Sequence, residues 1–239
     1  MNAVNEPVLI LQNLTPDGSG YLGAWLAQQG IPFDVFNTEA GDAYPWSVSG
    51  YRGVALLGGE MSANDDLPSL RQAERLIVQA MDADIPVIGH CLGGQLMVRA
   101  LGAKVIVSPK PEIGWQTLQV ADTPLAHAWF GDPGERTVYH WHGESFELPV
   151  GAALLATNAS CPHQAFAIGR HLALQFHVEL DADKLAAWSA SVDPALLRQQ
   201  RRCPTVQSGT AMREQGRTAL PAQQQLAARL YRHWLDLAQ

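Results

Sequence analysis

The segment Pro86–Gln95, with the sequence PVIGHCLGGQ, constrains the fold more than any other part of the chain. Its small and β-branched residues predict a buried strand, and apolar residues at helical spacing follow from Leu92 to Leu101. Glycines at positions 89 and 93 allow a sharp turn with no bulky side chain against the backbone. Such a strand–turn–helix unit presents its central residue, Cys91, at the carboxyl end of a parallel sheet, where open α/β sheets bind ligands.

The rest of the N-terminal half repeats this alternation of strands and helices. Apolar runs predict strands that are buried on both faces, and apolar residues three and four apart predict the helices between them. The expected strands are Val8–Leu11, Phe33–Phe36, Val54–Leu57 and Pro86–Gly89, and the expected helices are Tyr21–Gln29, Leu67–Met81 and Leu92–Leu101. This pattern predicts an α/β fold with a mostly parallel central sheet covered on both faces.

After Lys104 the pattern changes to strand-like segments joined by short turns. These segments are Trp115–Val120, Thr137–Trp141, Ala153–Thr157, Ala165–Ile168 and Leu172–Phe176. We expect antiparallel additions to the sheet and a last central strand that returns to Cys91. Residues 181–239 predict a helical C-terminal extension, interrupted by a loop at Cys203–Thr210 and ending in a helix at Gln223–Leu237. The whole chain, 1–239, is expected to be a single domain with its core at about 8–180.

Charge and cysteine content exclude several classes of protein. The 239 residues carry 16 Lys and Arg against 23 Asp and Glu, a formal net charge of −7, whereas nucleic acid binding needs a basic surface. The three cysteines are widely spaced and odd in number, which argues against a disulfide framework and fits a reducing compartment. No secretory signal is visible, and the apolar runs are too short to span a membrane. We therefore expect a cytoplasmic protein that binds neither nucleic acid nor membranes.

Cys91 is the candidate nucleophile. Unpaired backbone N–H groups and the dipole at the start of a helix favour a thiolate there. A buried structural cysteine is the alternative, but the glycines around Cys91 favour an activated one. Cys161 and Cys203 each precede a proline in an expected loop and have no comparable setting.

His177 is the candidate base among eight histidines. It follows the last apolar strand, and Glu179 comes two residues later. Residues i and i+2 of an extended chain point to the same side, so Glu179 can reach one ring nitrogen while the other faces Cys91. A lone His-x-Glu pair is a weak signal, and the cysteine turn strengthens it.

Two of these segments, Gly89–Gln95 and Phe176–Glu179, resemble the class I glutamine amidotransferases of the triad type. Three more look like stand-alone members that are similar to the glutaminase half of GMP synthase: Leu57–Ser62, Pro111–Trp115 and Tyr139–Glu144. The resemblance covers about residues 8–180 and implies a flavodoxin-like three-layer α/β sandwich. The family often has Pro where this chain has Val178, a position that shapes the turn without taking part in chemistry.

The resemblance also implies a reaction. Cys91 would attack a γ-glutamyl amide, glutamine above all, and form a γ-glutamyl thioester while ammonia or an amine leaves. His177 would transfer the protons, and Glu179 would orient the imidazole and stabilise its charge. The resemblance implies no organic cofactor and no metal.

The same resemblance assigns the groups that bind the substrate. The backbone N–H groups of Gly59 and Leu92 would form an oxyanion hole, because such donors stabilise a tetrahedral oxyanion. Gln95 matches a position beside the substrate, and its alternative is a solvent-facing place in the first helical turn.

Other functions stay open at this point. No ammonia-consuming domain follows the amidotransferase-like region, so a synthetase partner would have to accept the ammonia. Otherwise the chain would act as a γ-glutamyl peptidase or hydrolase. A non-catalytic regulatory or binding subunit is a further class, although such members usually lose the Cys, the His or the Glu. An α/β-hydrolase would have its acid before the histidine rather than after it.

A metal site is the remaining alternative. The pairs His140-x-His142 and Cys161-x-His163 contain residue types that bind zinc, which takes four converging ligands. Nothing in their spacing requires the two pairs to converge, so we expect no metal.

Overall fold

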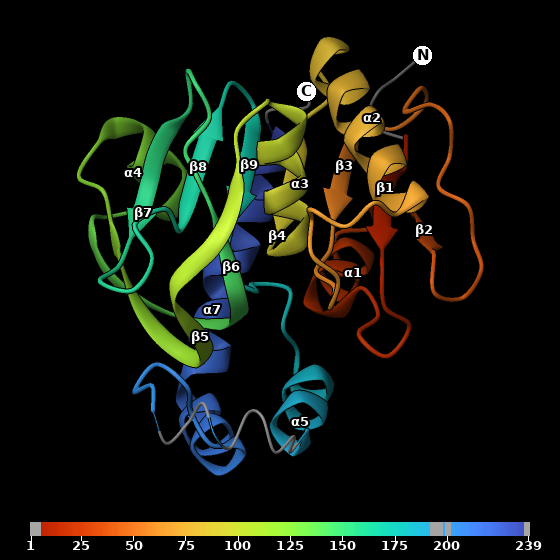
Figure 1. Cartoon of the computed structure of the whole chain (residues 1–239). Coiled ribbons are helices and arrows are strands. Elements are labelled where there is room, and N and C mark those ends of the chain that lie inside the picture. The colour runs from red at the N-terminus through yellow and green to blue at the C-terminus, as the bar shows by residue number, and fades with distance from the viewer. Residues whose placement is uncertain (1–5, 192–197, 199–201, 237–239) are drawn as a thin grey trace.

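The computed structural model describes residues 6–191, 198 and 202–236, and the following account is confined to them. Five strands run parallel: β1 (Val8–Gln12), β2 (Phe33–Asn37), β3 (Gly53–Leu56), β4 (Val87–His90) and β9 (His171–Leu174). Four antiparallel strands extend them: β5 (Val105–Val120), β6 (Gly134–Phe146), β7 (Ala153–Thr157) and β8 (Ala165–Ile168). The sheet has the order β2-β1-β3-β4-β9-β8-β7-β5-β6 (Figure 1).

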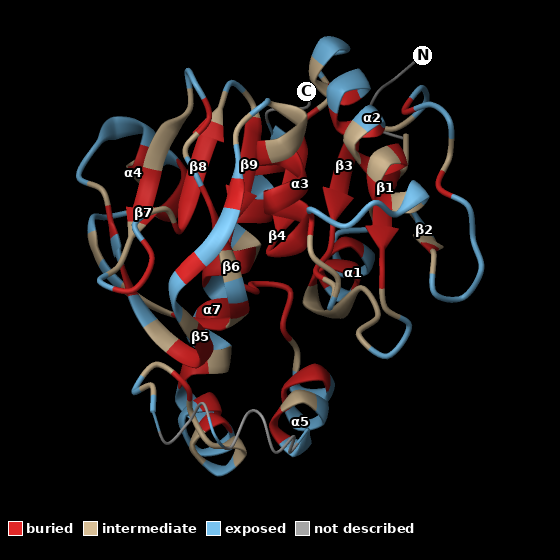
Figure 2. Ribbon diagram, viewed as in Figure 1, coloured by how far each residue is buried: buried red, intermediate tan, exposed pale blue. Residues whose placement is uncertain are grey.

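Helices cover both faces of this sheet. Helices α2 (Pro68–Asp82) and α3 (Leu92–Ala100) pack on one face. Helices α1 (Gly20–Gln28), α4 (Pro124–Phe130) and α7 (Gly209–Asp236) pack on the other, and α5 (Ala182–Ala190) packs against α7. Buried residues concentrate along the central strands and the helix faces that cover them (Figure 2). The flavodoxin-like three-layer α/β prediction is confirmed.

Local sequence explains most of these elements. The parallel strands β1, β3, β4 and β9 are buried at every position because helices cover both of their faces. Helix α2 buries a stripe of residues three and four apart, which includes Leu70, Ala73 and Ile77. Pro68 is its first residue, a position where the missing backbone N–H costs nothing.

The second half differs from the prediction in extent. Strand β5 begins at Val105 instead of Trp115, and β6 runs from Gly134 to Phe146, so the two form a long antiparallel ribbon. Sequence analysis missed the first part of β5 because the ladder register shifts between Val107 and Glu112, which interrupts the apolar pattern. Helix α4 was also missed, although Thr123 caps it by accepting a hydrogen bond from the Ala126 amide.

The predicted C-terminal extension consists of α5 and α7 in the part that the structure describes. Helix α7 begins at Gly209, so the predicted loop 203–210 ends earlier than expected, and the predicted helix 223–237 is the second half of a 28-residue helix. Residue 237 lies outside the described residues. Leu230 and Trp234 of α7 are fully buried in the core. None of the described helices is both long and apolar enough to cross a membrane.

Trp234→Ala should lower the free energy of unfolding by about 3–5 kcal/mol, because it leaves a large cavity against the parallel strands. A Cβ at Gly53 of β3 would lie 3.0 Å from the Trp234 ring, so strand and helix are in close contact. Urea denaturation followed by circular dichroism measures the change. Trp46→Ala is the matched control, since Trp46 is 80% exposed, and it should change stability by about 0.5 kcal/mol or less. Equal effects of the two substitutions would contradict tight packing of α7 on the sheet.

Candidate active site

Cys91 forms the turn between β4 and α3. Its backbone has φ 48° and ψ −106°, a conformation that residues with a side chain rarely adopt. Its N–H donates to the Leu174 carbonyl of β9 at 2.8 Å, and its carbonyl accepts from the Gln95 N–H at 3.0 Å. These two bonds hold the strained turn between a central strand and the first turn of the helix.

Glycines allow this turn to lie directly on the sheet. A Cβ at Gly89 would lie 2.5 Å from the Gly93 carbonyl carbon, and one at Gly94 would lie 2.7 Å from the Leu174 oxygen. Either side chain would push the start of α3 away from β4 and β9. The glycines of this segment therefore set the position of Cys91.

His177 and Glu179 form a buried pair beside the turn. Nδ1 of His177 lies 2.6 Å from Oε1 of Glu179. The predicted contact forms, but the segment is a turn rather than an extended strand, because β9 ends at Leu174 and the Leu180 N–H lies 3.4 Å from the His177 carbonyl. Gly58 leaves room for the ring, since a Cβ there would lie 2.9 Å from Cε1 of His177 and 3.9 Å from the Cys91 Cβ.

The electrostatics of the pair favour a charged imidazole. Burial alone lowers the pKa of His177, but the Glu179 carboxylate and the Cys91 side chain outweigh it and hold the pKa well above its usual range. Burial raises the pKa of Glu179, and the cationic His177 reverses this and holds it below its usual range. The second ring nitrogen, Nε2, is buried and makes no hydrogen bond of standard length within the described residues, so it is available on the side of Cys91.

Residues outside the predicted set of Cys91, His177 and Glu179 hold His177 in place. Its N–H donates to the Tyr139 carbonyl at 2.8 Å. Gln223 of α7 accepts from the Tyr139 N–H at 2.7 Å and donates to the His177 carbonyl at 3.0 Å. Trp188 of α5 packs edge-on against the imidazole, with 4.9 Å between ring centroids. Because Gln223 lies in an Ala- and Gln-rich helix, its sequence context predicts a position in solvent. No local sequence signal therefore identified it as a contact of His177.

A cleft of about 610 Å³ opens at Cys91. The predicted positions Gly59, Leu92 and Gln95 line it together with Cys91 and His177. Its other lining residues are Leu14, Asp17, Glu60, Met61, Ser62, Ile113, Trp141, His142, Gly143, Glu144, Trp188 and Ser191.

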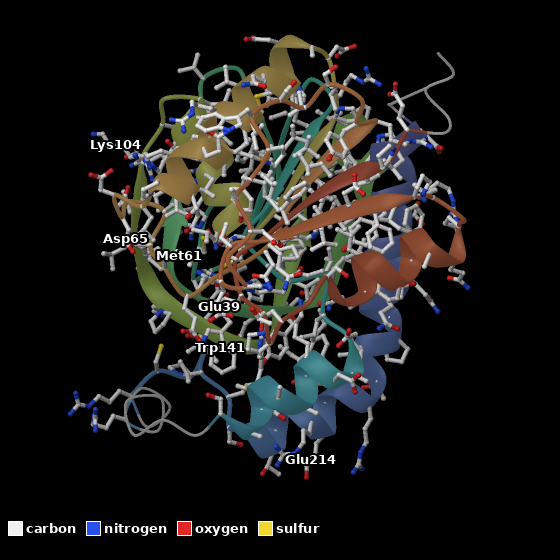
Figure 3. All side chains as sticks on the ribbon, turned by 90° about the vertical axis from the view of Figure 1, so that its right-hand side faces the viewer. Glu39, Met61, Asp65, Lys104, Trp141 and Glu214 are labelled. Carbon is white, nitrogen blue, oxygen red and sulfur yellow. The ribbon has the colours of Figure 1, made fainter. Side chains whose placement is uncertain are left out.

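Gln95 does not face solvent, so that alternative is wrong. It is buried, and its amide nitrogen lies 3.3 Å from both the Glu144 carbonyl and Oε1 of Gln175. Gln175 in turn reaches the Cys91 sulfur at 3.7 Å. Trp141, labelled in Figure 3, faces Trp188 of α5 across a centroid distance of 5.7 Å, and its carbonyl lies 3.8 Å from the same sulfur.

Comparison with known proteins identifies the family of the chain. The family model "Glutamine amidotransferase class-I" matches residues 24–185. The chain belongs to this family. As a class I glutamine amidotransferase it has a fold and a set of polar groups suited to glutaminase-type chemistry.

Individual relatives extend this result. The chain is 32% identical over 176 residues to the glutamine amidotransferase-like protein YfeJ of Salmonella typhimurium, covering 70% of this chain and 73% of YfeJ. It is 36% identical over 190 residues to the glutamine-hydrolyzing GMP synthase of Bacillus pumilus, covering 75% of this chain and 34% of the synthase. The chain thus spans about a third of that synthase.

Solved structures are similar over nearly the whole chain. A glutamine amidotransferase from Methylobacillus flagellatus has a TM-score of 0.90 at 33% identity, covering 98% of this chain and 96% of its own. A glutamine amidotransferase from Thermotoga maritima has a TM-score of 0.86 at 25% identity, covering 97% and 99%.

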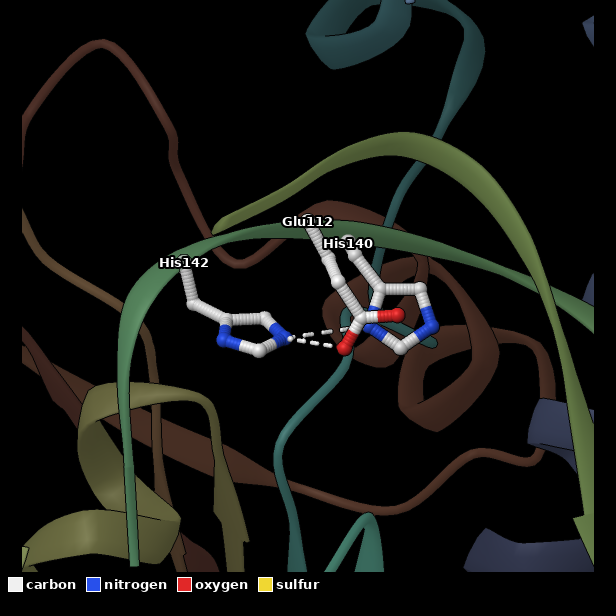
Figure 4. Close-up of side chains that lie close together, drawn as sticks. All are labelled: Glu112, His140 and His142. Atoms are coloured by element: carbon white, nitrogen blue, oxygen red, sulfur yellow. Dashed lines mark hydrogen bonds and ion pairs between the residues drawn. The ribbon is translucent and has the colours of Figure 1, made fainter. Parts of the chain in front are cut away.

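A second buried polar cluster adjoins the cleft of this amidotransferase, and one of its members, His142, lines the cleft. Glu112 of β5 meets His140 and His142 of β6 (Figure 4). Burial lowers the pKa of His140 to about 3. Burial opposes the charge on Glu112, but its hydrogen bond to His142 and the nearby His140 lower its pKa to about 2.

The other pair with zinc-binding residue types lies outside this cluster. The Cys161 thiol donates to the His163 carbonyl at 3.4 Å, and burial raises its pKa to about 11. Nδ1 of His163 donates to the Phe146 carbonyl at 2.8 Å. The third residue beside His140 and His142 is Glu112, and not a member of the Cys161 and His163 pair. The spacing of the histidines in the sequence did not predict it.

Gly58→Ala should slow alkylation of Cys91 by iodoacetamide about tenfold or more, because the added Cβ would displace the ring of His177, the predicted acceptor of the thiol proton. Mass spectrometry of the Cys91 peptide separates this site from Cys161 and Cys203. Gly143→Ala is the matched control in the same cleft, since a Cβ there meets nothing within 4 Å, and it should keep the rate within about twofold. Equal rates in both variants would mean that His177 does not act on Cys91.

Proposed function

We propose that the chain hydrolyses a γ-glutamyl amide, glutamine first, through a thioester on Cys91. The observation that carries the proposal is the buried arrangement of Cys91, His177 and Glu179 at the cleft. It supplies a nucleophile at a helix N-terminus, a base and a group that orients the base. Family membership and the glutamine-hydrolyzing relatives support the same chemistry.

In the first half-reaction, the Cys91 sulfur attacks the γ-carboxamide carbon, a C–S bond forms, and the carbonyl electron pair moves to oxygen. His177 protonates the amide nitrogen, the C–N bond breaks, and ammonia leaves. Glu179 accepts the Nδ1–H bond throughout, which fixes the ring so that Nε2 serves the reacting atoms.

Two backbone amides are suited to the developing oxyanion. Leu92 is the first residue of α3, so its N–H has no acceptor within the helix. A Cβ at Gly59 would lie 2.8 Å from Cδ2 of Leu92, so the two residues approach closely at the cleft. We assign these amides to the oxyanion hole, where the loss of one donor costs about 3–4 kcal/mol in related chemistry.

In the second half-reaction, water attacks the thioester carbonyl and His177 takes its proton. The C–S bond breaks, glutamate leaves, and Cys91 is restored. The ammonia then passes to an acceptor, which we assign to a synthetase because one of the relatives is a glutamine-hydrolyzing GMP synthase.

Hydrolysis of a γ-glutamyl peptide or conjugate is a second candidate. The size of the cleft favours it, because a volume of about 610 Å³ exceeds that of one amino acid and the cleft continues past Trp188 to Asp17 and Ser191. The non-catalytic subunit has no such support, because the nucleophile, base and acid are all present and adjacent.

Glutamate release from a panel of substrates tests the proposal. The panel contains glutamine, γ-glutamyl dipeptides, glutathione and a γ-glutamyl anilide. Cys91→Ala should abolish release, because the thioester cannot form, while far-UV circular dichroism stays unchanged. Cys203→Ala is the matched control and should retain turnover, since the Cys203 sulfur contacts Thr205 and Pro111 and does not line the cleft.

The pattern across the panel separates the candidates. Release from glutamine that depends on Cys91 supports an ammonia donor. Release from γ-glutamyl peptides alone supports the peptidase. Normal turnover by Cys91→Ala, or no release by the unmodified chain together with no covalent adduct on Cys91 from a γ-glutamyl electrophile, would overturn the thioester proposal.

A further inference from the structure

Glu112, His140 and His142 bring three potential metal ligands together inside the protein. Their ligand atoms all lie within 4.8 Å of one another, and all three residues are buried. Nε2 of His142 lies 3.2 Å from Oε2 of Glu112 and 3.3 Å from Nδ1 of His140 (Figure 4). Two ligand atoms bound to one tetrahedral zinc ion are separated by about 3.3 Å, because each lies about 2.0–2.2 Å from the metal. The two shortest separations therefore match those around a single ion.

The hydrogen bonds around the cluster leave lone pairs turned inward. Nδ1 of His142 lies 2.9 Å from the Glu144 carbonyl, which can only accept, so this nitrogen carries the hydrogen. In the neutral ring, Nε2 then presents a lone pair toward the Glu112 carboxylate and toward His140. Without a metal ion, His142 must be a buried imidazolium that donates to Glu112, or its Nε2 lone pair repels the carboxylate. A metal ion accepts the lone pairs of all three at once.

The surrounding residues orient these ligands as metal ligands are usually oriented. A ligating histidine almost always donates its second N–H to a carbonyl or carboxylate, as His142 does to Glu144. The Glu112 carboxylate is held by two amide donors, Asn158 at 2.6 Å and Gln164 at 2.7 Å. Nδ1 of His140 faces His142, and its other ring nitrogen, Nε2, is buried without a hydrogen bond within the described residues. The contacts of Glu112 and His142 therefore match those usually found around metal ligands.

We propose that Glu112, His140 and His142 bind one divalent transition-metal ion of the zinc class. Two imidazoles and one carboxylate suit zinc, cobalt or nickel, whereas magnesium and calcium prefer sites made entirely of oxygen ligands. Three protein ligands leave a fourth position for water. This inference does not depend on the proposed function, because none of the three residues belongs to the Cys91, His177 and Glu179 set.

The cleft gives the ion a path of entry, and the bound ion would stabilise the wall of the cleft. His142 lines the cleft, which provides a path from solvent to the cluster. Trp141 lies between the two histidines, and its carbonyl is 3.8 Å from the Cys91 sulfur. A bound ion would tie β5 to β6 and fix the part of the wall that contains Trp141.

The test uses the full-length Cys91→Ala variant, so that a thiol and His177 cannot bind the added metal together. The chelator-treated protein is titrated with Co²⁺ and followed by its visible d–d absorption, and Zn²⁺ uptake after equilibrium dialysis is measured by elemental mass spectrometry. We expect one ion per chain and cobalt bands typical of tetrahedral or five-coordinate nitrogen and oxygen ligands. Zn²⁺ should also raise the melting temperature.

Substitutions in the cluster test whether its residues bind the ion. Glu112→Gln and His142→Asn should each remove the cobalt bands and the zinc-dependent rise in melting temperature. Asn158→Ala keeps all three ligands and removes one hydrogen bond to Glu112, so it should weaken Co²⁺ binding about tenfold, even if a ligand variant fails to fold. His127→Asn is the control, because His127 forms a partly exposed pair with Asp122 that would bind metal adventitiously, and it should change nothing.

Two outcomes would overturn the inference. One is less than stoichiometric uptake by the Cys91→Ala protein, with no cobalt bands, which would make the cluster a set of hydrogen bonds alone. The other is uptake that survives Asn158→Ala and the folded ligand variants unchanged but is lost in His127→Asn, which would place the metal on the surface.

Discussion

The contact between the first turn of α3 and the sheet is the constraint on which the rest of this structure depends. Because residues 89, 93 and 94 have no side chains, the helix begins directly on β3, β4 and β9. This contact keeps Cys91 in a strained conformation and aims the N-terminus of α3 at the cleft. It also sets the distance to His177, whose ring occupies the space beside Gly58. A methyl group at any of these glycines would alter packing and chemistry together.

The C-terminal helix contacts the candidate active site as well as the core. Gln223 joins the backbones of Tyr139 and His177, so α7 fixes the turn that carries the imidazole. Farther along the same helix, the Tyr231 hydroxyl lies 3.3 Å from Nε2 of His90, the residue before Cys91. Both polar contacts are buried, where an unpaired group would cost about 1–3 kcal/mol, so they specify how α7 docks on the sheet.

Two buried histidine–carboxylate groups flank the same stretch of β6. His177 lines the cleft beside Cys91 and pairs with Glu179, whereas the cluster of Glu112 with two histidines reaches the cleft through His142. Burying such charges is costly unless each one is paired. Each carboxylate has a histidine partner, which explains why the pKa values of Glu112 and Glu179 both fall below their usual range despite burial.

Local sequence was enough to predict the features that depend on near neighbours. Apolar runs and helical spacing predicted the parallel strands and α2, and the glycines around Cys91 predicted the turn, because strand periodicity, helix periodicity and glycine conformations are properties of short segments. The contact between His177 and Glu179 was also expected, although the segment is a turn and not a strand. Only the tertiary structure decided which distant groups meet: Gln223 with His177, and Glu112 with His140 and His142. These contacts join residues that are 46 and about 30 positions apart, and no local pattern encodes them, because a polar side chain looks the same in sequence whether the fold buries it or leaves it in water.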